Sequence, residues 1–133
     1  MLLADIKLIE VNTLDVIFKH AITEPGQGKI RVEYGEIEFE AGGILTVDAS
    51  SATIRIKAAP AVYGFRDGQE NDDFSLKIGI SMLYVYPSNQ SLDETYLQEN
   101  HWYFASMLKT YFKFYAEDIF NKSSIDGVKL PYN

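Results

Sequence analysis

The sequence predicts an α+β fold in which an antiparallel sheet of about four strands is followed by a long C-terminal helix packed on one face. Apolar and polar residues alternate through most of the first two-thirds of the chain, which is typical of half-buried strands. After residue 90 the period changes to that of a helix. The 133 residues contain no repeat and no long linker, so we expect a single domain spanning 1–133.

The composition narrows the function classes. The chain has no cysteine, which excludes disulfides and thiolate chemistry. A net charge of -7 makes it an acidic protein that repels phosphate backbones and anionic lipids, so we expect neither nucleic acid nor membrane as a partner. Residues 1–10 lack the features of a signal peptide, and no apolar run reaches the length of a membrane span. These observations predict a cytoplasmic protein.

Two strand regions open the chain. Residues 4–20 alternate with phase slips, which predicts either one long strand with a bulge or two short strands joined near Asn12 and Thr13. A loop containing Pro25 follows. Residues 29–43 alternate clearly, and the phase slips at Gly35, so we expect one half-buried strand with a glycine bulge.

Two further strands follow. Residues 44–60 alternate best around Ile54 and Ile56, and their Arg55 and Lys57 are expected to face the glutamates of the preceding strand. The polar, acidic residues 63–73 predict a loop. Residues 74–88 carry apolar side chains at every second position and then on both faces, which predicts a central strand.

The remainder is predicted to be helical. Ser91 and Glu94 have the spacing of a capping box, in which each side chain satisfies a main-chain amide of the first turn. A short helix over 92–99 is expected to end near Asn100. A long helix then continues to about residue 121, where Ser, Gly and Asp residues follow.

The long helix is unusually rich in aromatic residues. It holds eight of the eighteen aromatic residues in the chain, and its apolar arc covers about half of the circumference, whereas a stripe of roughly 100° suffices for one core. One side predicts a buried stripe: Phe104, Leu108, Phe112, Tyr115 and Ile119. The other side predicts an oligomer interface: Tyr103, Met107, Tyr111 and Phe114. A narrow polar edge remains: Ser106, Lys109, Lys113 and Glu117.

Such a wide arc requires two covering surfaces. The sheet is one of them. The second is another protomer, a polypeptide client, or other parts of the same chain. We prefer a homo-oligomer, dimer or tetramer, and keep cover by loops of the same chain as the alternative.

The sequence offers little for catalysis. His20 and His101 are far apart, and no metal-ligand, nucleophile or phosphate-loop motif is present. The oxygen-rich segment 67–73 lacks the spacing of a calcium loop, and the glutamates between residues 33 and 40 are typical of a solvated strand face. We therefore expect no enzyme, no metal and no cofactor. A small enzyme that uses these glutamates remains the least favoured alternative.

The order of elements resembles the SecB-like family of protein-export chaperones. Two short segments carry the resemblance: Tyr103, Phe104 and Ala105 at the start of the long helix, and Leu130, Pro131 and Asn133 in the tail. The chain differs from the family pattern, because no proline opens the helix and Ser106 stands where an arginine is expected. The sequence after Leu130 also lacks the family's second helix and acidic tail. The resemblance therefore does not extend to docking on a translocase.

The resemblance implies a fold and a function. In SecB-like tetramers the sheets lie outside, the long helices are sandwiched between dimers, and unfolded polypeptide binds along apolar grooves. It thus implies a chaperone-like oligomer that binds apolar segments of non-native or partner polypeptides. Four residues near the start of the helix are candidates for that binding: Tyr96, Leu97, Trp102 and Tyr103. The alternative for these residues is simple interface packing, and the alternative for the protein is an adaptor for one specific folded partner.

Overall fold

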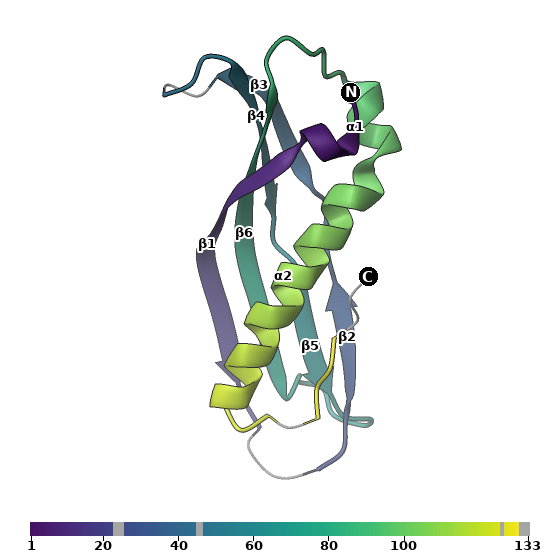
Figure 1. The fold of residues 1–133 in the computed structure, drawn as a ribbon. Coiled ribbons are helices and arrows are strands. Elements are labelled where there is room, and N and C mark those ends of the chain that lie inside the picture. The colour runs from purple at the N-terminus through teal and green to yellow at the C-terminus, as the bar shows by residue number, and fades with distance from the viewer. Residues whose placement is uncertain (23–25, 45–46, 126, 131–133) are drawn as a thin grey trace.

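The structure is a computed structural model that describes residues 1–22, 26–44, 47–125 and 127–130. These residues form the following elements: η1 (Leu3–Asp5), β1 (Lys7–His20), β2 (Lys29–Glu33), β3 (Glu38–Ile44), β4 (Ser51–Ala58), β5 (Ala61–Phe65), β6 (Phe74–Pro87), α1 (Glu94–Glu99) and α2 (His101–Lys122). The strands form one antiparallel sheet, and α2 crosses one face of it diagonally (Figure 1). The predicted α+β fold is confirmed.

The six strands occupy four positions across the sheet, because β4 and β5 lie end to end beside β6, and β3 and β2 lie outside them. β6 is central, as predicted: it pairs along its length with β1 on one side, and with β4 and then β5 on the other. β3 extends the sheet outward from β4, and β2 extends it from β5. The chain thus crosses from β1 to the opposite edge of the sheet before it returns strand by strand, which is a Greek key arrangement.

β1 is one long strand rather than two short ones. Its pairing with β6 shifts register between Leu8 and Glu10 and again between Thr13 and Asp15, which accounts for the phase slips in the sequence. Among the described residues β1 pairs only with β6, so it forms an edge of the sheet. Pro25 of the predicted loop lies outside the described residues.

Two strand predictions were wrong in detail. The expected single strand over 29–43 is divided, because β2 ends at Glu33 and β3 begins at Glu38. Gly35 lies between them with a φ of 71°, a left-handed conformation that interrupts a strand and that glycine adopts without strain. The expected loop over 63–73 begins later, since Ala61–Phe65 forms β5. Pro60, which has no amide hydrogen to donate, separates β4 from β5.

The predicted charge register is present. Glu38 lies opposite Lys57, and Glu40 lies opposite Arg55, in the β3–β4 pair. The Arg55 guanidinium, however, donates to Ser81 Oγ at 2.8 Å, on the other neighbouring strand. The outer face of the sheet therefore has a polar contact between β4 and β6, while the glutamates of β3 are register neighbours of the basic residues.

The two helices are separated at Asn100, as predicted. Asn100 has a non-helical backbone, and its side-chain amide donates to the carbonyl of Tyr96. The predicted capping box of Ser91 and Glu94 was wrong, because α1 begins two residues later than that spacing implies. Asp93 is the N-cap, and its carboxylate accepts from the Tyr96 amide at 2.9 Å.

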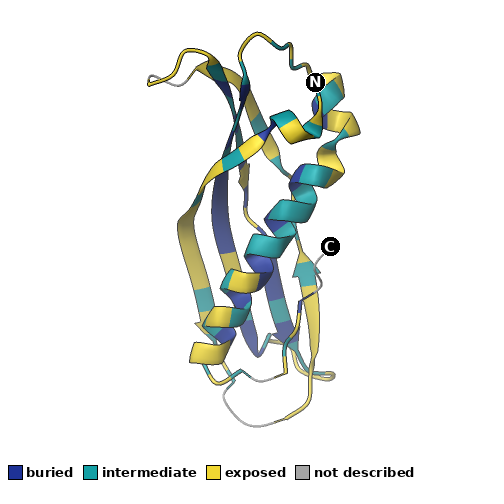
Figure 2. Cartoon of the chain, in the orientation of Figure 1, coloured by how far each residue is buried: buried dark blue, intermediate teal, exposed yellow. Residues whose placement is uncertain are grey.

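The core lies between β6 and α2 (Figure 2). Every second residue of β6 faces the helix and is buried: Phe74, Leu76, Ile78, Ile80, Met82, Tyr84 and Tyr86. The Phe104 ring contacts the Tyr84 ring at 5.1 Å and the Phe39 ring at 5.5 Å, both edge-on. These contacts fix the first turn of α2 to β6 and β3.

The buried stripe of α2 is rotated relative to the prediction. Phe104, Leu108 and Phe112 are buried as expected, but Tyr115 and Ile119 are only half-buried. Ala116 and Phe120 take their place, and Phe120 packs against the ring of Phe74 at 5.1 Å. The side chains of Tyr115 and Ile119 therefore lie at the border of the buried face and not at its centre.

The predicted polar edge was also wrong for Lys113, which is 7% exposed. Its Nζ donates to Glu117 Oε2 and to the carbonyl of Leu130, both at 2.6 Å. Glu117 Oε2 also accepts from the Leu130 amide at 3.3 Å. The segment 127–130, which we call the tail, thus covers this flank of α2 and buries the Leu130 side chain. Pro131 and Asn133 lie outside the described residues.

We predict that Phe104→Ala lowers the free energy of unfolding by about 3–5 kcal/mol, because it removes a fully buried ring and leaves a cavity. Urea denaturation at low protein concentration measures the loss. The matched control is Phe114→Ala on the same helix, whose side chain is 54% exposed and should cost less than about 1 kcal/mol. Equal losses for the two variants would contradict the described packing.

We predict that Glu117→Gln lowers stability at pH 7 by about 1–2 kcal/mol. Burial alone would raise the pKa of Glu117, but the hydrogen bonds from Lys113 and from the Leu130 amide outweigh it, so the pKa is lowered. The carboxylate therefore stabilises the fold fully above its ordinary pKa of 4.5, and this contribution is lost as the pH falls through the lowered value.

Chemical denaturation over a series of pH values from 7 downward should accordingly show a difference between Glu117→Gln and the unaltered chain that is full above the ordinary pKa and disappears as the pH falls through the lowered one. The control is Asp118→Asn, which breaks the exposed pair with Lys122 on the same helix and should cost less than about 1 kcal/mol. A pH-independent difference for Glu117→Gln would show that its charge is not what stabilises the tail.

Candidate functional site

One flank of α2 carries the four residues predicted as an interface, which we call the helix stripe: Tyr103, Met107, Tyr111 and Phe114. Phe114 is 54% exposed, and the other three are half-buried. Met107 lies over β6, where the hydroxyl of Tyr84 donates to its sulfur at 3.4 Å. Burial raises the pKa of Tyr84, and the neighbouring Tyr103 and Tyr111 add to that rise. The helix stripe is thus anchored on the sheet but remains partly uncovered.

The edge strand β1 is also apolar and exposed. Four of its side chains have exposed fractions between 46% and 56%: Ile9, Leu14, Val16 and Ile17. An edge strand with exposed apolar residues offers main-chain groups as well as apolar side chains to a neighbour. Together with the helix stripe, it leaves two apolar surfaces without a covering element among the described residues.

A groove runs along the opposite flank of α2, between the helices and the β2–β3 edge of the sheet. It consists of two hollows that share Ile37. The upper hollow, of about 520 Å³, is lined by Ile37, Phe39, Ala41, Leu92, Asp93, Glu94, Leu97 and Gln98. The middle hollow, of about 530 Å³, is lined by Tyr34, Gly35, Ile37, His101, Trp102, Ala105, Ser106, Leu108 and Lys109. We call the two together the side groove.

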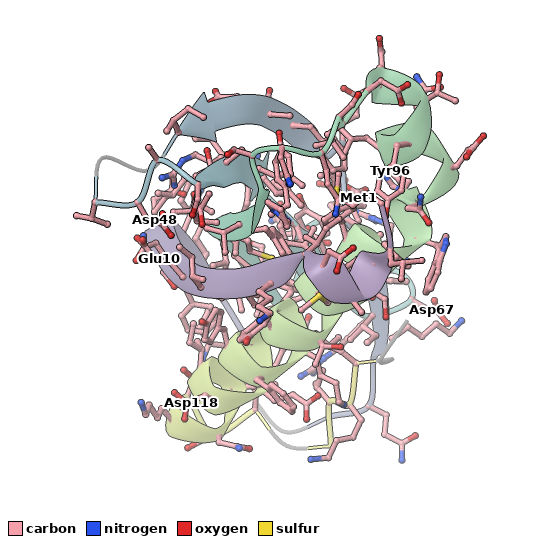
Figure 3. The ribbon with its side chains drawn as sticks, turned by 45° about the horizontal axis from the view of Figure 1, so that its top comes forward. Met1, Glu10, Asp48, Asp67, Tyr96 and Asp118 are labelled. Atoms are coloured by element: carbon pink, nitrogen blue, oxygen red, sulfur yellow. The ribbon has the colours of Figure 1, made fainter. Side chains whose placement is uncertain are left out.

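The side groove contains only part of the predicted binding set. Leu97 lines the upper hollow, and Trp102, 62% exposed, lines the middle one. Tyr96 instead lies beside the N-terminal segment near Met1 (Figure 3). Burial raises the pKa of Tyr96, and Asp5 and Tyr103 raise it further. Tyr96 and Tyr103 therefore line neither hollow, although the Tyr103 ring packs edge-on against the Trp102 ring at 6.0 Å.

Sequence reasoning missed the sheet side of the groove. Tyr34, Ile37 and Phe39 line it from the gap between β2 and β3 and from β3 itself. The Lys109 ammonium lies 4.7 Å from the Tyr34 ring centre, and the Phe112 ring packs edge-on against it. The alternation of residues 29–43 identified these side chains as core-facing, but it contained no signal that the helices would leave them accessible.

Tyr34 has an unusual hydroxyl. Its Oη is buried and has no hydrogen-bond partner within the described part of the chain. Burial raises the pKa of Tyr34, while the nearby positive charge of Lys113 opposes the rise. A buried hydroxyl without a hydrogen bond is unfavourable, so this part of the groove wall is not fully satisfied in the structure.

The other candidate sites do not assemble. In the acidic loop after β5, Arg66 Nε lies 2.5 Å from Asp73 Oδ2, and this ion pair closes the hairpin between β5 and β6. Across residues 1–22, 26–44, 47–125 and 127–130, no three or more acidic or histidine side chains gather in a way that would hold a metal ion. None of the described helices has the length and apolarity needed to cross a bilayer. The arrangement is suited to binding apolar chain segments.

Comparison with known proteins identifies a structural relative. No family model and no curated protein sequence matches the chain. A solved structure does: the Mycobacterium tuberculosis SecB-like chaperone Rv1957, in complex with a ChAD peptide from the HigA1 antitoxin Rv1956. The two chains superpose with a TM-score of 0.64 over 96% of this chain and 90% of that one, at 15% sequence identity. The order and packing of the sheet and the long helix, together with this superposition, show that the chain has a SecB-like fold.

Proposed function

We propose that this chain is a non-enzymatic, chaperone-like protein that binds extended apolar segments of non-native or partner polypeptides in the side groove. The observation that carries the proposal is the groove itself, whose sheet wall is apolar and whose helix wall combines Leu97 and the exposed indole of Trp102 with polar and charged side chains. Accessible apolar surface of this kind marks an interaction site in a folded protein. Its two hollows follow one another along the helices, which suits a chain segment better than a compact small molecule.

The sheet edge beside the groove supplies main-chain recognition. β3 pairs with β4 on one side, and its other edge pairs with no described segment. An extended peptide can add to such an edge through main-chain hydrogen bonds and place alternate side chains in the hollows. Main-chain bonds are independent of sequence, so this mode gives affinity for many apolar segments.

The structural relative supports this proposal. Rv1957 is described as a SecB-like chaperone, and its structure contains a bound peptide. The acidic charge of the present chain and its absence of cysteine agree with action on polypeptides in the cytoplasm.

A second candidate function is an adaptor that serves one specific partner. It is favoured by the same relative, whose bound peptide comes from a particular antitoxin. The adaptor would use the same groove but recognise a defined sequence, so a narrow range of bound peptides distinguishes it from a general chaperone.

We further propose that the helix stripe and β1 are covered by other copies of the chain. Phe114 on the helix and Leu14 and Ile17 on the strand expose half or more of their side chains, which is costly in water. A dimer or tetramer would bury both surfaces and leave the side groove, on the opposite flank of α2, open to a polypeptide.

We predict that Trp102→Ala weakens the binding of a permanently unfolded client by about five- to tenfold, because it removes the largest apolar side chain of the groove. Fluorescence anisotropy of a labelled client measures the affinity, and circular dichroism and light scattering confirm that fold and mass are unchanged. The matched control is Phe114→Ala, another exposed aromatic on α2, which should leave client affinity within about twofold. A loss of mass in Trp102→Ala would instead place Trp102 in the subunit interface.

We predict that light scattering in a sizing run gives two or four times the 15.1 kDa of one chain, and that excess unfolded client co-elutes with this species. Phe114→Glu should lower the mass, since it places a charge in the helix stripe. Asp118→Ala, on the exposed side of the same helix, should not. A wild-type monomer would contradict the assembly proposal, and an oligomer that ignores all unfolded clients would favour the adaptor.

A further inference from the structure

The tail already shows how an extended segment binds beside α2. Its residue Leu130 is held at both main-chain groups: the carbonyl accepts from Lys113 Nζ at 2.6 Å, and the amide donates to Glu117 Oε2 at 3.3 Å. The Leu130 side chain is only 3% exposed, and Val128 packs against the core. We call the side chains of Lys113 and Glu117 the clamp. The clamp binds main-chain atoms of the tail, while the adjacent apolar surface buries the Leu130 side chain.

The tail lies in line with the side groove. It runs beside β2 on the same flank of α2 as the groove (Figure 1). Below it is a hollow of about 670 Å³, whose lining includes Val128, Ile30 and Phe74 together with the charged Arg66 and Asp73. Above it is the middle hollow, whose wall includes Tyr34 and Lys109, one helical turn before Lys113. The tail therefore occupies the interval between two open hollows on one flank of the helix.

The clamp does not depend on the tail for its own charge balance. Lys113 Nζ and Glu117 Oε2 lie 2.6 Å apart on successive turns of α2, and their side chains are 9% and 17% exposed. If the tail moves away, the two groups remain paired with one another. Both hydrogen bonds from the clamp to the tail are made to main-chain atoms of Leu130, so an extended residue of another polypeptide can replace it there. The remaining contact is the ion pair of Glu117 Oε1 with Lys129 Nζ at 3.7 Å, which an apolar segment without a lysine at this place would not reproduce.

The tail has the chemistry of the ligand proposed above. Its described residues are Gly127, Val128, Lys129 and Leu130, so apolar side chains recur at every second position and alternate with an exposed lysine. The Lys129 side chain is 76% exposed, and its Nζ lies 3.7 Å from Glu117 Oε1. This is the spacing of an extended strand with one buried face.

We propose that the tail is an intramolecular ligand that closes the lower part of the side groove, and that an extended apolar segment of a partner polypeptide displaces it and takes over the clamp. Displacement would join the hollows below and above the tail into one groove along α2. The tail then lowers the apparent affinity of the chain for a partner segment, because the partner must displace an attached segment before it can use the full groove. This inference rests on the proposed function, and it adds the site and the regulation of binding.

The test uses a fluorescein-labelled peptide of residues 124–133, added to the full-length chain. The unaltered chain should bind it weakly, because its own tail holds the clamp. Leu130→Ala releases that tail, so the variant should bind the labelled peptide at least about tenfold more tightly. Lys122→Ala, an exposed lysine at the end of α2 that does not contact the clamp, is the control and should behave as the unaltered chain. A labelled peptide that carries Ala in place of Leu130 should bind neither the unaltered chain nor the Leu130→Ala variant.

A second measurement uses the unaltered chain and does not depend on the variant's folding. Hydrogen exchange at the amides of residues 127–130 should become faster when a permanently unfolded client is added, because the client expels the tail. Slower exchange at the same amides on addition of client would overturn displacement. Equal binding of the labelled peptide to the unaltered chain and to Leu130→Ala would overturn the role of the tail as a competing ligand.

The two proposals fail in different ways. If the client binds with equal affinity to the unaltered chain and to Leu130→Ala and does not compete with the labelled peptide, displacement is wrong and the proposed function stands. If the labelled peptide binds Leu130→Ala tightly but no unfolded client binds either protein, the proposed function is wrong. Displacement by a partner then fails with it.

Discussion

Helix α2 carries apolar side chains around more of its circumference than one face of a small sheet covers. The other surfaces of the protein follow from this excess, because each flank of the helix has to be covered or left exposed. The row from Phe104 to Phe112 is buried on β6 and β3. One flank is covered at its lower end by the tail, through Lys113, while the helix stripe on the other flank remains partly exposed. Exposing the remaining apolar surface to water is unfavourable, and this is the basis of the proposal that another polypeptide covers it.

The two flanks differ in what they offer a partner. The helix stripe and β1 present side chains and a long strand edge, which suits a second copy with the same surfaces. The side groove combines the free edge of β3, apolar hollows and, at its lower end, paired charges that hold a main chain. Recognition of main-chain atoms and apolar side chains requires an extended ligand and discriminates little between sequences. Folded proteins rarely present such segments, whereas non-native chains do.

Local pattern predicted the elements well and their interruptions poorly. The strict alternation in β6 identified a central strand, and Asn100 was identified as the break between the helices. Gly35 and Pro60 were visible in the sequence, but a glycine in a strand pattern indicates a bulge as readily as a break, and only pairing with the neighbouring strand decides between them. The burial of Lys113 depends on the carbonyl of Leu130, which lies 17 residues away, so no helical periodicity could reveal it.

The candidate site was predictable on one wall only. Trp102 and Leu97 were identified because they exceed what a single core needs, and both line the side groove. Tyr96 and Tyr103 satisfy the same criterion but line neither hollow, since the direction of each side chain is set by how α1 joins α2 at Asn100. Tyr34 and Ile37 could not be identified, because their place in the groove follows from the diagonal path of α2 over the sheet.

Trp102 is the only tryptophan of the chain, so its fluorescence reports directly on the side groove. The most direct test of the account is the emission spectrum of the full-length protein during titration with an extended apolar peptide that lacks tryptophan. If the peptide occupies the side groove, water leaves the indole and the emission shifts to shorter wavelength in proportion to the bound fraction. Binding that is complete by anisotropy but leaves the Trp102 emission unchanged would show that polypeptides bind elsewhere, and it would contradict the account.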